Sequence, residues 1–372
     1  MALYRIAPVL FFIPLFFYSY FYFRRIVLLI RRKELLPVQK AACAVAALIF
    51  TVPAMNVWGM WALVVLHLAA TAGIVDIVRI LVEKKKQRRN GFWYRICCSG
   101  LLPVLMTALV LGYGFLNMRQ ILETEYTVSA ERSLAEEEYR VVFLSDLHFG
   151  TTMDGERLEK ICERIGESDP DVVILGGDIV DERTDREAME EAFQILAGIP
   201  SGYGIYYIYG NHDKGRYSPD SDFTAQELEQ AVADSGIVIL EDETVSLNQD
   251  LTLTGRRDRT DAKRDDAERA SAGKLLSGAE EESYHILVDH QPRYFEKNAE
   301  AGYDLMLSGH THGGQIWPVG LLTELFDRAT INYGHEIVDG MDVIVSSGIG
   351  GWGYPVRTGC HSEYVTVHIT GE

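Results

Sequence analysis

The sequence is 372 residues long, with 48% hydrophobic residues and a formal net charge of −18 at pH 7, which is enough chain for two or three domains. The first 118 residues hold 14 of the 35 Lys and Arg residues but three of the 53 Asp and Glu residues, whereas the remainder holds 21 basic and 50 acidic residues. A part this acidic repels polyanions, so nucleic acid is not an expected partner.

Four apolar segments in the basic part predict a transmembrane region over residues 1–118. Each approaches the roughly 20 residues needed to cross the hydrocarbon core, so we expect about four helices in an all-α arrangement. A cleaved signal peptide is the alternative for the first segment, but bulky and basic residues follow it in place of a small-residue cleavage site. The segments are residues 6–23, 41–58, 60–81 and 96–118, with residues 56–59 as the break between the second and third.

Lys and Arg residues in the connecting loops predict the orientation of this region. The loops after the first and third segments carry six each, against three on the other side, at Arg5, Arg119 and Arg132. Because such residues stay in the cytoplasm, we expect a multi-pass protein of the cell membrane whose C-terminal domain lies outside the cytoplasm. Asp76 and Arg79 are interpreted as an interfacial ion pair rather than as a functional site.

The acidic residues 119–138, rich in Ser and Glu, predict a stalk, and a domain follows over residues 139–372. Apolar runs alternate with helical patterns in the first half of this domain, which predicts an α/β fold with largely buried strands. Helical patterns are sparser among the later apolar runs, which indicates a second, mixed or antiparallel sheet.

Polar residues that can bind metal follow five of the apolar runs. Ligands of open α/β sheets bind beyond the carboxyl ends of the strands, so we expect these side chains at one edge. A single Asp-x-His or Asn-His is more often a turn or a cap, but five such endings are too many for coincidence. The endings are Asp146 with His148, Asp178 with Asp181, Asn211-His212-Asp213, Asp289-His290, and His310 with His312.

The donor set indicates what is bound. Seven candidate ligands exceed the roughly four to six that one transition metal uses, so we expect two divalent ions. Nitrogen and oxygen donors without cysteine favour Mn, Fe or Zn and argue against calcium. The seven candidates are Asp146, His148, Asp178, Asn211, His290, His310 and His312.

The motifs D-x-H, G-D-x-x-D, G-N-H-D and G-H-x-H, with a further histidine between the last two, resemble those of the calcineurin-like metallophosphoesterase superfamily. The resemblance covers about residues 139–370. The stretches GHTHGGQ and SSGIGGWGYPVR are similar to a branch of membrane-anchored bacterial phosphoesterases, which includes enzymes similar to UDP-diacylglucosamine pyrophosphatases. The resemblance implies a four-layer sandwich of two mixed β-sheets flanked by helices.

The resemblance also implies roles for the site residues. A hydroxide that bridges the two ions would attack the phosphorus. We assign His212 as general acid or charge stabiliser, oriented by Asp181 as the matching residue is in the family. One ion would take Asp146, His148, Asp178 and His312, and the other Asp178, Asn211, His290 and His310, with Asp178 bridging.

The implied reaction is hydrolysis of phosphodiester or pyrophosphate bonds. The apolar and aromatic residues 316–326 and 348–355 predict a wall beside the metals that suits lipid-linked or envelope substrates, with Trp317 and Trp352 as contacts. Buried core or a covered sheet edge is the alternative for both segments.

Arginines that follow strand ends are candidates for binding phosphate. Arg357 is expected to bind the substrate, whereas Arg256, Arg257 and Arg259 fit either a phosphate site or a solvated charged loop. Two other functions stay open: a metal-binding membrane sensor or scaffold without turnover, and a protein phosphatase.

Overall fold

The computed structural model describes residues 2–56, 59–86, 91–327 and 330–371, without the side chains of residues 2–11 and 84–86. The chain divides into two compact units, Met1–Gly114 and Phe115–Glu372. The predicted break between the second and third apolar segments includes residues 57–58, and the basic loop after the third segment includes residues 87–90. Residues 57–58 and 87–90 lie outside the described residues.

Among the described residues, four helices are long and apolar enough to cross a membrane, as predicted. These candidate spans are Phe12–Arg31, Pro37–Met55, Met60–Glu83 and Leu101–Arg119. The elements that contain them, with one shorter helix, are α1 (Ala2–Arg31), α2 (Pro37–Thr51), the 3-10 helix η1 (Val52–Met55), α3 (Met60–Lys86), α4 (Phe92–Ser99) and α5 (Leu101–Arg119).

Two boundaries in this region differ from the prediction. The expected fourth segment, residues 96–118, is interrupted by Gly100, whose left-handed backbone (φ 84°) caps α4. Glycine adopts this conformation without a Cβ clash, so it ends one helix and the next begins at Leu101. At the other end, α1 continues to Arg31, although a loop was expected after residue 23.

Asp76 belongs to a larger charge network than the predicted pair with Arg79. Its carboxylate accepts hydrogen bonds from Tyr18 Oη (3.2 Å), Arg79 Nε (3.4 Å) and Arg25. Arg79 also pairs with Glu83 at 3.0 Å. The network joins α1 to α3, so these charges in apolar helices neutralise one another, as a medium of low dielectric requires.

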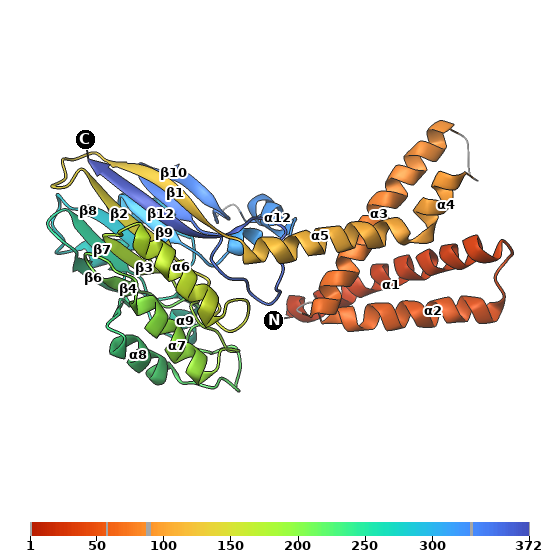
Figure 1. Cartoon of the computed structure of the whole chain (residues 1–372), viewed down its shortest axis with the longest axis horizontal. Helices are drawn as coiled ribbons and strands as arrows, with labels where there is room; N and C mark the ends of the chain where they lie inside the picture. The colour runs from red at the N-terminus through yellow and green to blue at the C-terminus, as the bar shows by residue number, and fades with distance from the viewer. Residues whose placement is uncertain (1, 57–58, 87–90, 328–329, 372) are drawn as a thin grey trace. The chain divides into compact units, whose positions relative to one another are not determined.

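The second unit contains two six-stranded mixed sheets (Figure 1). The strands are β1 (Ile121–Ala130), β2 (Glu138–Leu144), β3 (Val172–Leu175), β4 (Ile205–Tyr207), β5 (Val238–Ile239), β6 (Glu243–Ser246), β7 (Leu251–Gly255), β8 (Tyr284–Val288), β9 (Leu305–Ser308), β10 (Gly334–Val338), β11 (Met341–Val345) and β12 (Ser362–Gly371). The first sheet has the order β1-β12-β2-β3-β4-β5 and the second β10-β11-β9-β8-β7-β6. Strands β2, β3 and β4 are parallel to one another, and so are β7, β8 and β9.

Helices cover the outer faces of both sheets, which confirms the four-layer sandwich. Buried residues of α6, α7 and α8, such as Ile165 and Phe193, pack on the first sheet. A second apolar cluster, with Ile174 and Ile286, fills the space between the sheets. Phe295 of α11 packs in a third cluster on the second sheet. These helices are α6 (Gly155–Glu167), α7 (Arg186–Ala197), α8 (Ala225–Asp234), α9 (Arg259–Arg264), α10 (Ala272–Leu276), α11 (Phe295–Glu300) and α12 (Val319–Phe326).

The predicted stalk over residues 119–138 is wrong for most of its length. Residues 121–130 form β1, an edge strand that pairs in parallel with β12 along its whole length. Val128 and Ala130 face the buried layer between the sheets, whereas Glu125 is exposed. Charged residues on edge strands discourage pairing with other chains. Because the charged residues of β1 are acidic, the sequence of this strand resembles that of a polar stalk.

Candidate metal centre

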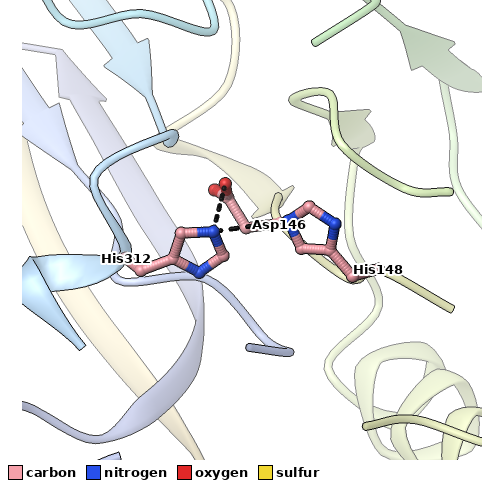
Figure 2. Close-up of side chains that lie close together, drawn as sticks. All are labelled: Asp146, His148 and His312. Atoms are coloured by element: carbon pink, nitrogen blue, oxygen red, sulfur yellow. Dashed lines mark hydrogen bonds and ion pairs between the residues drawn. The ribbon is translucent and has the colours of Figure 1, made fainter. Parts of the chain in front are cut away.

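The first group of metal-binding side chains contains Asp146, His148 and His312, from the loops after β2 and β9. Their ligand atoms all lie within 4.8 Å of one another. His312 Nε2 is 3.4 Å from Asp146 Oδ1 and 3.3 Å from His148 Nε2 (Figure 2). A carboxylate oxygen and two imidazole nitrogens that converge in this way fit a divalent transition metal.

The second group contains Asp178, His290 and His310, from the loops after β3, β8 and β9, with ligand atoms again within 4.8 Å of one another. Asp178 Oδ2 lies 3.2 Å from His290 Nε2 and 3.9 Å from His148 Nε2 of the first group. The Asp178 carboxylate therefore stands between the two groups, where a bridging ligand is needed. Both sheets contribute, because the carboxyl ends of their parallel strands meet at this edge.

Further properties of these side chains fit resident metal ions. Asn211 Oδ1 is buried and has no hydrogen-bond partner among the described residues, although Asn211 Nδ2 donates to Tyr217 Oη at 3.3 Å. Buried polar atoms are nearly always paired, so a cation would satisfy this oxygen. Burial lowers the pKa of His310 to about 4 and that of His312 to about 3. Both imidazoles are therefore neutral at neutral pH, which is the form that binds metal.

The backbone of the site is strained at the ligands. Left-handed backbone is uncommon for residues other than glycine, and such strain gathers at functional sites. Neighbouring glycines allow close approach: a Cβ on Gly309 would lie 2.2 Å from Asp146 Oδ2, and one on Gly210 would lie 2.2 Å from Asp178 Oδ1. The ligand candidates with positive φ are Asp146 (54°), His148 (44°), Asp178 (52°), His310 (72°) and His312 (51°).

Asp181 orients His148, not His212 as expected. Its Oδ2 accepts a hydrogen bond from His148 Nδ1 at 3.1 Å, and both side chains are buried. A carboxylate behind a metal-binding imidazole fixes the ring and its tautomer. The prediction failed because the loop after β3 turns Asp181 toward the first ligand group.

Glu182, and not Asp181, is the carboxylate that orients His212. Its Oε2 lies 2.9 Å from His212 Nδ1. Burial opposes protonation of His212, but the carboxylates of Asp178 and Glu182 raise its pKa above the usual value. The sequence contained a signal for this partner, since Glu182 is the acid directly after Asp181.

Asp213 is a further acid whose role the sequence did not reveal. Its carboxylate is fully buried and accepts backbone N–H groups from Asp178 (2.7 Å), Ile179 (2.8 Å) and Gly210 (2.6 Å). These bonds connect the loops after β3 and β4, so Asp213 fixes the backbone that carries Asp178. Its place as the last residue of G-N-H-D was the available signal.

Arg357 does not have the substrate-binding geometry predicted for it. The side chain is buried, and its guanidinium donates to the carbonyls of His312 (2.9 Å), Ser347 (2.9 Å) and Gly350. These bonds hold the loop that carries His312. Arg357 therefore supports the metal centre from within the fold, where a substrate phosphate does not reach it.

The two predicted aromatic contacts lie in different surroundings. The ring centroid of Trp352 is 5.6 Å from that of His212, so Trp352 lies at the metal centre. Trp317 is 63% exposed and precedes α12, in which no residue is buried. The buried-core alternative is thus wrong for this segment. Its exposed apolar side chains are Trp317, Val319, Leu321, Leu322, Leu325 and Phe326.

Comparison with known proteins identifies the family. The family model for the calcineurin-like phosphoesterase matches residues 139–314. An uncharacterized metallophosphoesterase of Aquifex aeolicus is 30% identical over 280 residues, which cover 72% of this chain and 99% of the relative. The chain belongs to the calcineurin-like metallophosphoesterase family.

Other members of this family are similar over part of their length. An uncharacterized metallophosphoesterase of Helicobacter pylori is 31% identical over 236 residues, 63% of this chain, and the matched part spans 60% of that relative. A transmembrane protein with metallophosphoesterase domain from Danio rerio is 28% identical over 279 residues, 72% of this chain and 62% of its own. With the four apolar helices, this likeness supports a membrane protein.

Proposed function

We propose that this metallophosphoesterase hydrolyses phosphodiester or pyrophosphate bonds of lipid-linked or envelope substrates, outside the cytoplasm and at the membrane surface. The observation that carries the proposal is the pair of ligand groups on either side of Asp178, with His212 beside them. Apart from Asp178, the candidates for one ion are Asp146, His148 and His312, and those for the other are Asn211, His290 and His310.

The protein side chains would position two divalent ions and the substrate. When bound, such ions supply a hydroxide nucleophile at neutral pH and offset charge on the phosphoryl oxygens. The backbone N–H of His212 donates to Asp178 Oδ1 at 2.8 Å, which keeps the imidazole next to the bridging carboxylate. Trp352 and Tyr217 flank the imidazole, with ring centroids 5.6 Å and 4.6 Å from that of His212.

His212 is the candidate for protonating the leaving oxygen. Glu182 binds Nδ1, so Nε2 is the nitrogen that can donate a proton to the substrate. Loss of the proton leaves a neutral imidazole that still hydrogen-bonds to Glu182. A positioned acid is needed because the leaving alkoxide or phosphate develops negative charge as the phosphorus–oxygen bond breaks.

The apolar surface of α12 supports a substrate that carries acyl chains. Exposed apolar patches of this kind on a soluble surface mark contacts with lipid or protein. The helix begins seven residues after His312, so it is joined to the metal-binding loop by a short segment. Trp317 and Phe326, at 63% and 84% exposed, stand at the two ends of the patch.

The first experiment compares hydrolysis of bis-(p-nitrophenyl) phosphate with that of p-nitrophenyl phosphate. The full chain in detergent is stripped of metal and then given Mn, Zn or Fe, with Asp178→Asn as the control. We expect metal-dependent cleavage, faster on the diester, that Asp178→Asn abolishes. A protein that binds two ions and turns over neither compound nor any lipid phosphoester would favour the sensor. Preference for a phosphorylated protein would favour a protein phosphatase.

A second experiment addresses the lipid part of the proposal. Trp317→Ala and Phe326→Ala are compared with Ile337→Ala, which removes an exposed apolar side chain from β10, an edge strand of the second sheet. We expect the first two variants to lose several-fold more activity on a lipid pyrophosphate in mixed micelles than on the small diester. Equal losses on both substrates would contradict a role in lipid binding.

A further inference from the structure

A cavity of about 320 Å³ lies in the phosphoesterase unit. It is on the outer side of the second sheet, between α11 and the segment after β7. Four of its lining side chains are cationic: Arg256, Arg259, Arg269 and Lys297. None of the described lining residues is acidic, although this part of the chain has 50 acidic against 21 basic residues. A local reversal of charge in an acidic domain indicates an anionic ligand.

Arg256, which is buried, and Arg269, which is partly buried, have unused hydrogen-bonding capacity. Arg256 is 6% exposed, and its Nη2 donates to Ala270 O at 2.7 Å. Arg269 Nη2 donates to Asp289 Oδ2 at 2.6 Å. The Nε atoms of both are buried without a partner among the described residues. An unpaired buried donor destabilises the fold, so a ligand that accepts hydrogen bonds from these two N–H groups would stabilise it.

The carboxylates nearest to these arginines do not line the cavity and are engaged in hydrogen bonds of their own. Asp289 pairs with Arg269 and lies 3.7 Å from Arg256 Nη1, so one carboxylate serves two guanidinium groups. Asp242 accepts the backbone N–H groups of Arg257 and Ala270. Asp258 accepts those of Thr260 and Asp261 and an amide hydrogen of Gln291.

Other lining groups suit a phosphate with an organic part attached. Asn298 is 1% exposed, and its Oδ1 is buried without a partner in the described structure. The Tyr294 ring has Arg259 Cζ at 5.9 Å and Lys297 Nζ at 6.0 Å from its centroid. Guanidinium groups bind phosphate oxygens with paired N–H bonds, and 320 Å³ is within the usual range for small-molecule sites.

One carboxylate links the wall of the cavity to the segment that carries a metal-ligand candidate. Asp289, which the arginines bind, directly precedes the ligand candidate His290, and Gln291 of the same segment bonds to Asp258. We propose that this cavity binds a phosphate group remote from the bond that is hydrolysed, so that the substrate carries a second phosphate or free phosphate acts as an effector. The first source rests on the proposed function. Of the three arginines after β7, Arg257 pairs instead with Asp265 at 2.6 Å in the charged loop.

The test measures phosphate binding to the full chain from which metal has been stripped, because phosphate then has no metal to bind. Isothermal titration with inorganic phosphate and with glycerol phosphate, at constant ionic strength, is compared with sulfate and chloride. Arg269→Gln and Lys297→Gln should weaken binding of phosphate on the order of tenfold. Lys274→Gln, an exposed lysine on α10 outside the cavity, should bind as the unaltered chain does.

The outcomes separate the possible sources of the phosphate. Tighter binding of glycerol phosphate supports a substrate headgroup, and tighter binding of inorganic phosphate supports a free effector. Absence of binding, or equal binding by Lys297→Gln and the unaltered chain, overturns the proposal; Lys297 is exposed, so its loss leaves the fold intact. Phosphate binding without any hydrolysis would refute the proposed function but not the anion site. Hydrolysis without phosphate binding would refute the anion site but not the proposed function.

Discussion

His212 and His148 each have their own carboxylate, and the two carboxylates are neighbours in the sequence. Asp181 binds the imidazole of a ligand candidate, whereas Glu182 binds the imidazole that we propose protonates the leaving oxygen. Adjacent residues can serve two rings because the chain turns here, with Thr184 N donating to Asp181 O at 3.1 Å across Glu182. The two acids should therefore affect different properties of the enzyme.

Replacing Glu182 should impair turnover. Glu182→Gln keeps the size of the side chain but removes the charge that holds His212 for proton donation, so we expect kcat to fall roughly tenfold to a hundredfold. Bound metal and KM should change little, because Glu182 contacts no ligand candidate. Steady-state kinetics with metal analysis of the same samples tests this, and loss of metal would contradict the assignment.

Replacing Asp181 should impair metal binding. Asp181→Asn weakens the hydrogen bond behind His148, and outer partners of this kind are worth about 10- to 100-fold in metal affinity. Titration of the stripped chain with Mn or Zn should show weaker binding of one of two ions, with activity restored at high metal concentration. Glu182→Gln is the matched control, and identical titrations of both variants would refute the distinction.

The candidate ligands could be predicted because each follows a buried apolar strand, and the partners of the ligands could not. Periodicity in the sequence reveals the strands, and parallel pairing brings their carboxyl ends to one edge of the sheet. Which acid faces which imidazole depends on the left-handed backbone of Asp178 and His148, which no periodicity encodes. The role of Arg357 was also predicted wrongly. Its guanidinium bonds to the loop of His312, which is far from Arg357 in the sequence.

At the scale of elements, β1 is the main difference from the sequence-based description. The other strands except β10 were found from apolar runs, but in β1 polar residues alternate with partly buried ones. An edge strand has a partner on one side only. Fewer of its side chains are buried, so its sequence contains fewer apolar residues than that of a central strand. The glycine that separates α4 from α5 was similarly hidden within an apolar stretch.

Removal of β1 should destabilise the phosphoesterase unit. A fragment that begins at residue 131 lacks the partner of β12, whereas one that begins at residue 115 keeps it. We expect the shorter fragment to melt several degrees lower and to aggregate, because the uncovered edge of β12 exposes unpaired backbone groups. Differential scanning calorimetry of both fragments measures this, and equal melting temperatures would show that β1 adds no stability.

At the scale of the whole chain, the separation of charge gives the protein two unlike regions. The basic residues of the membrane region gather in two loops, and the acidic residues lie in the part that contains the sheets. We propose, from the retention of Lys and Arg on the cytoplasmic side, that the metal centre works outside the cytoplasm.

The orientation can be measured with a tag on the C-terminus. Protease added to intact cells should remove the tag, because the predicted topology places it outside. Removing basic residues that follow the first apolar segment, with Arg24→Ser, Arg31→Ser and Arg32→Ser, should make part of the population resistant. Complete resistance of the unaltered chain would reverse the orientation and place the substrate in the cytoplasm.

The position of β12 between β1 and β2 has a consequence for the order of synthesis. β1 is the first strand of the unit to be made and β12 the last, and within the first sheet β1 pairs with β12. During translation, β1 therefore waits beside the membrane without a partner while all the other strands are made. The first sheet is complete after the last strand has been made, and a ribosome that stalls before residue 362 leaves two strand edges open to aggregation.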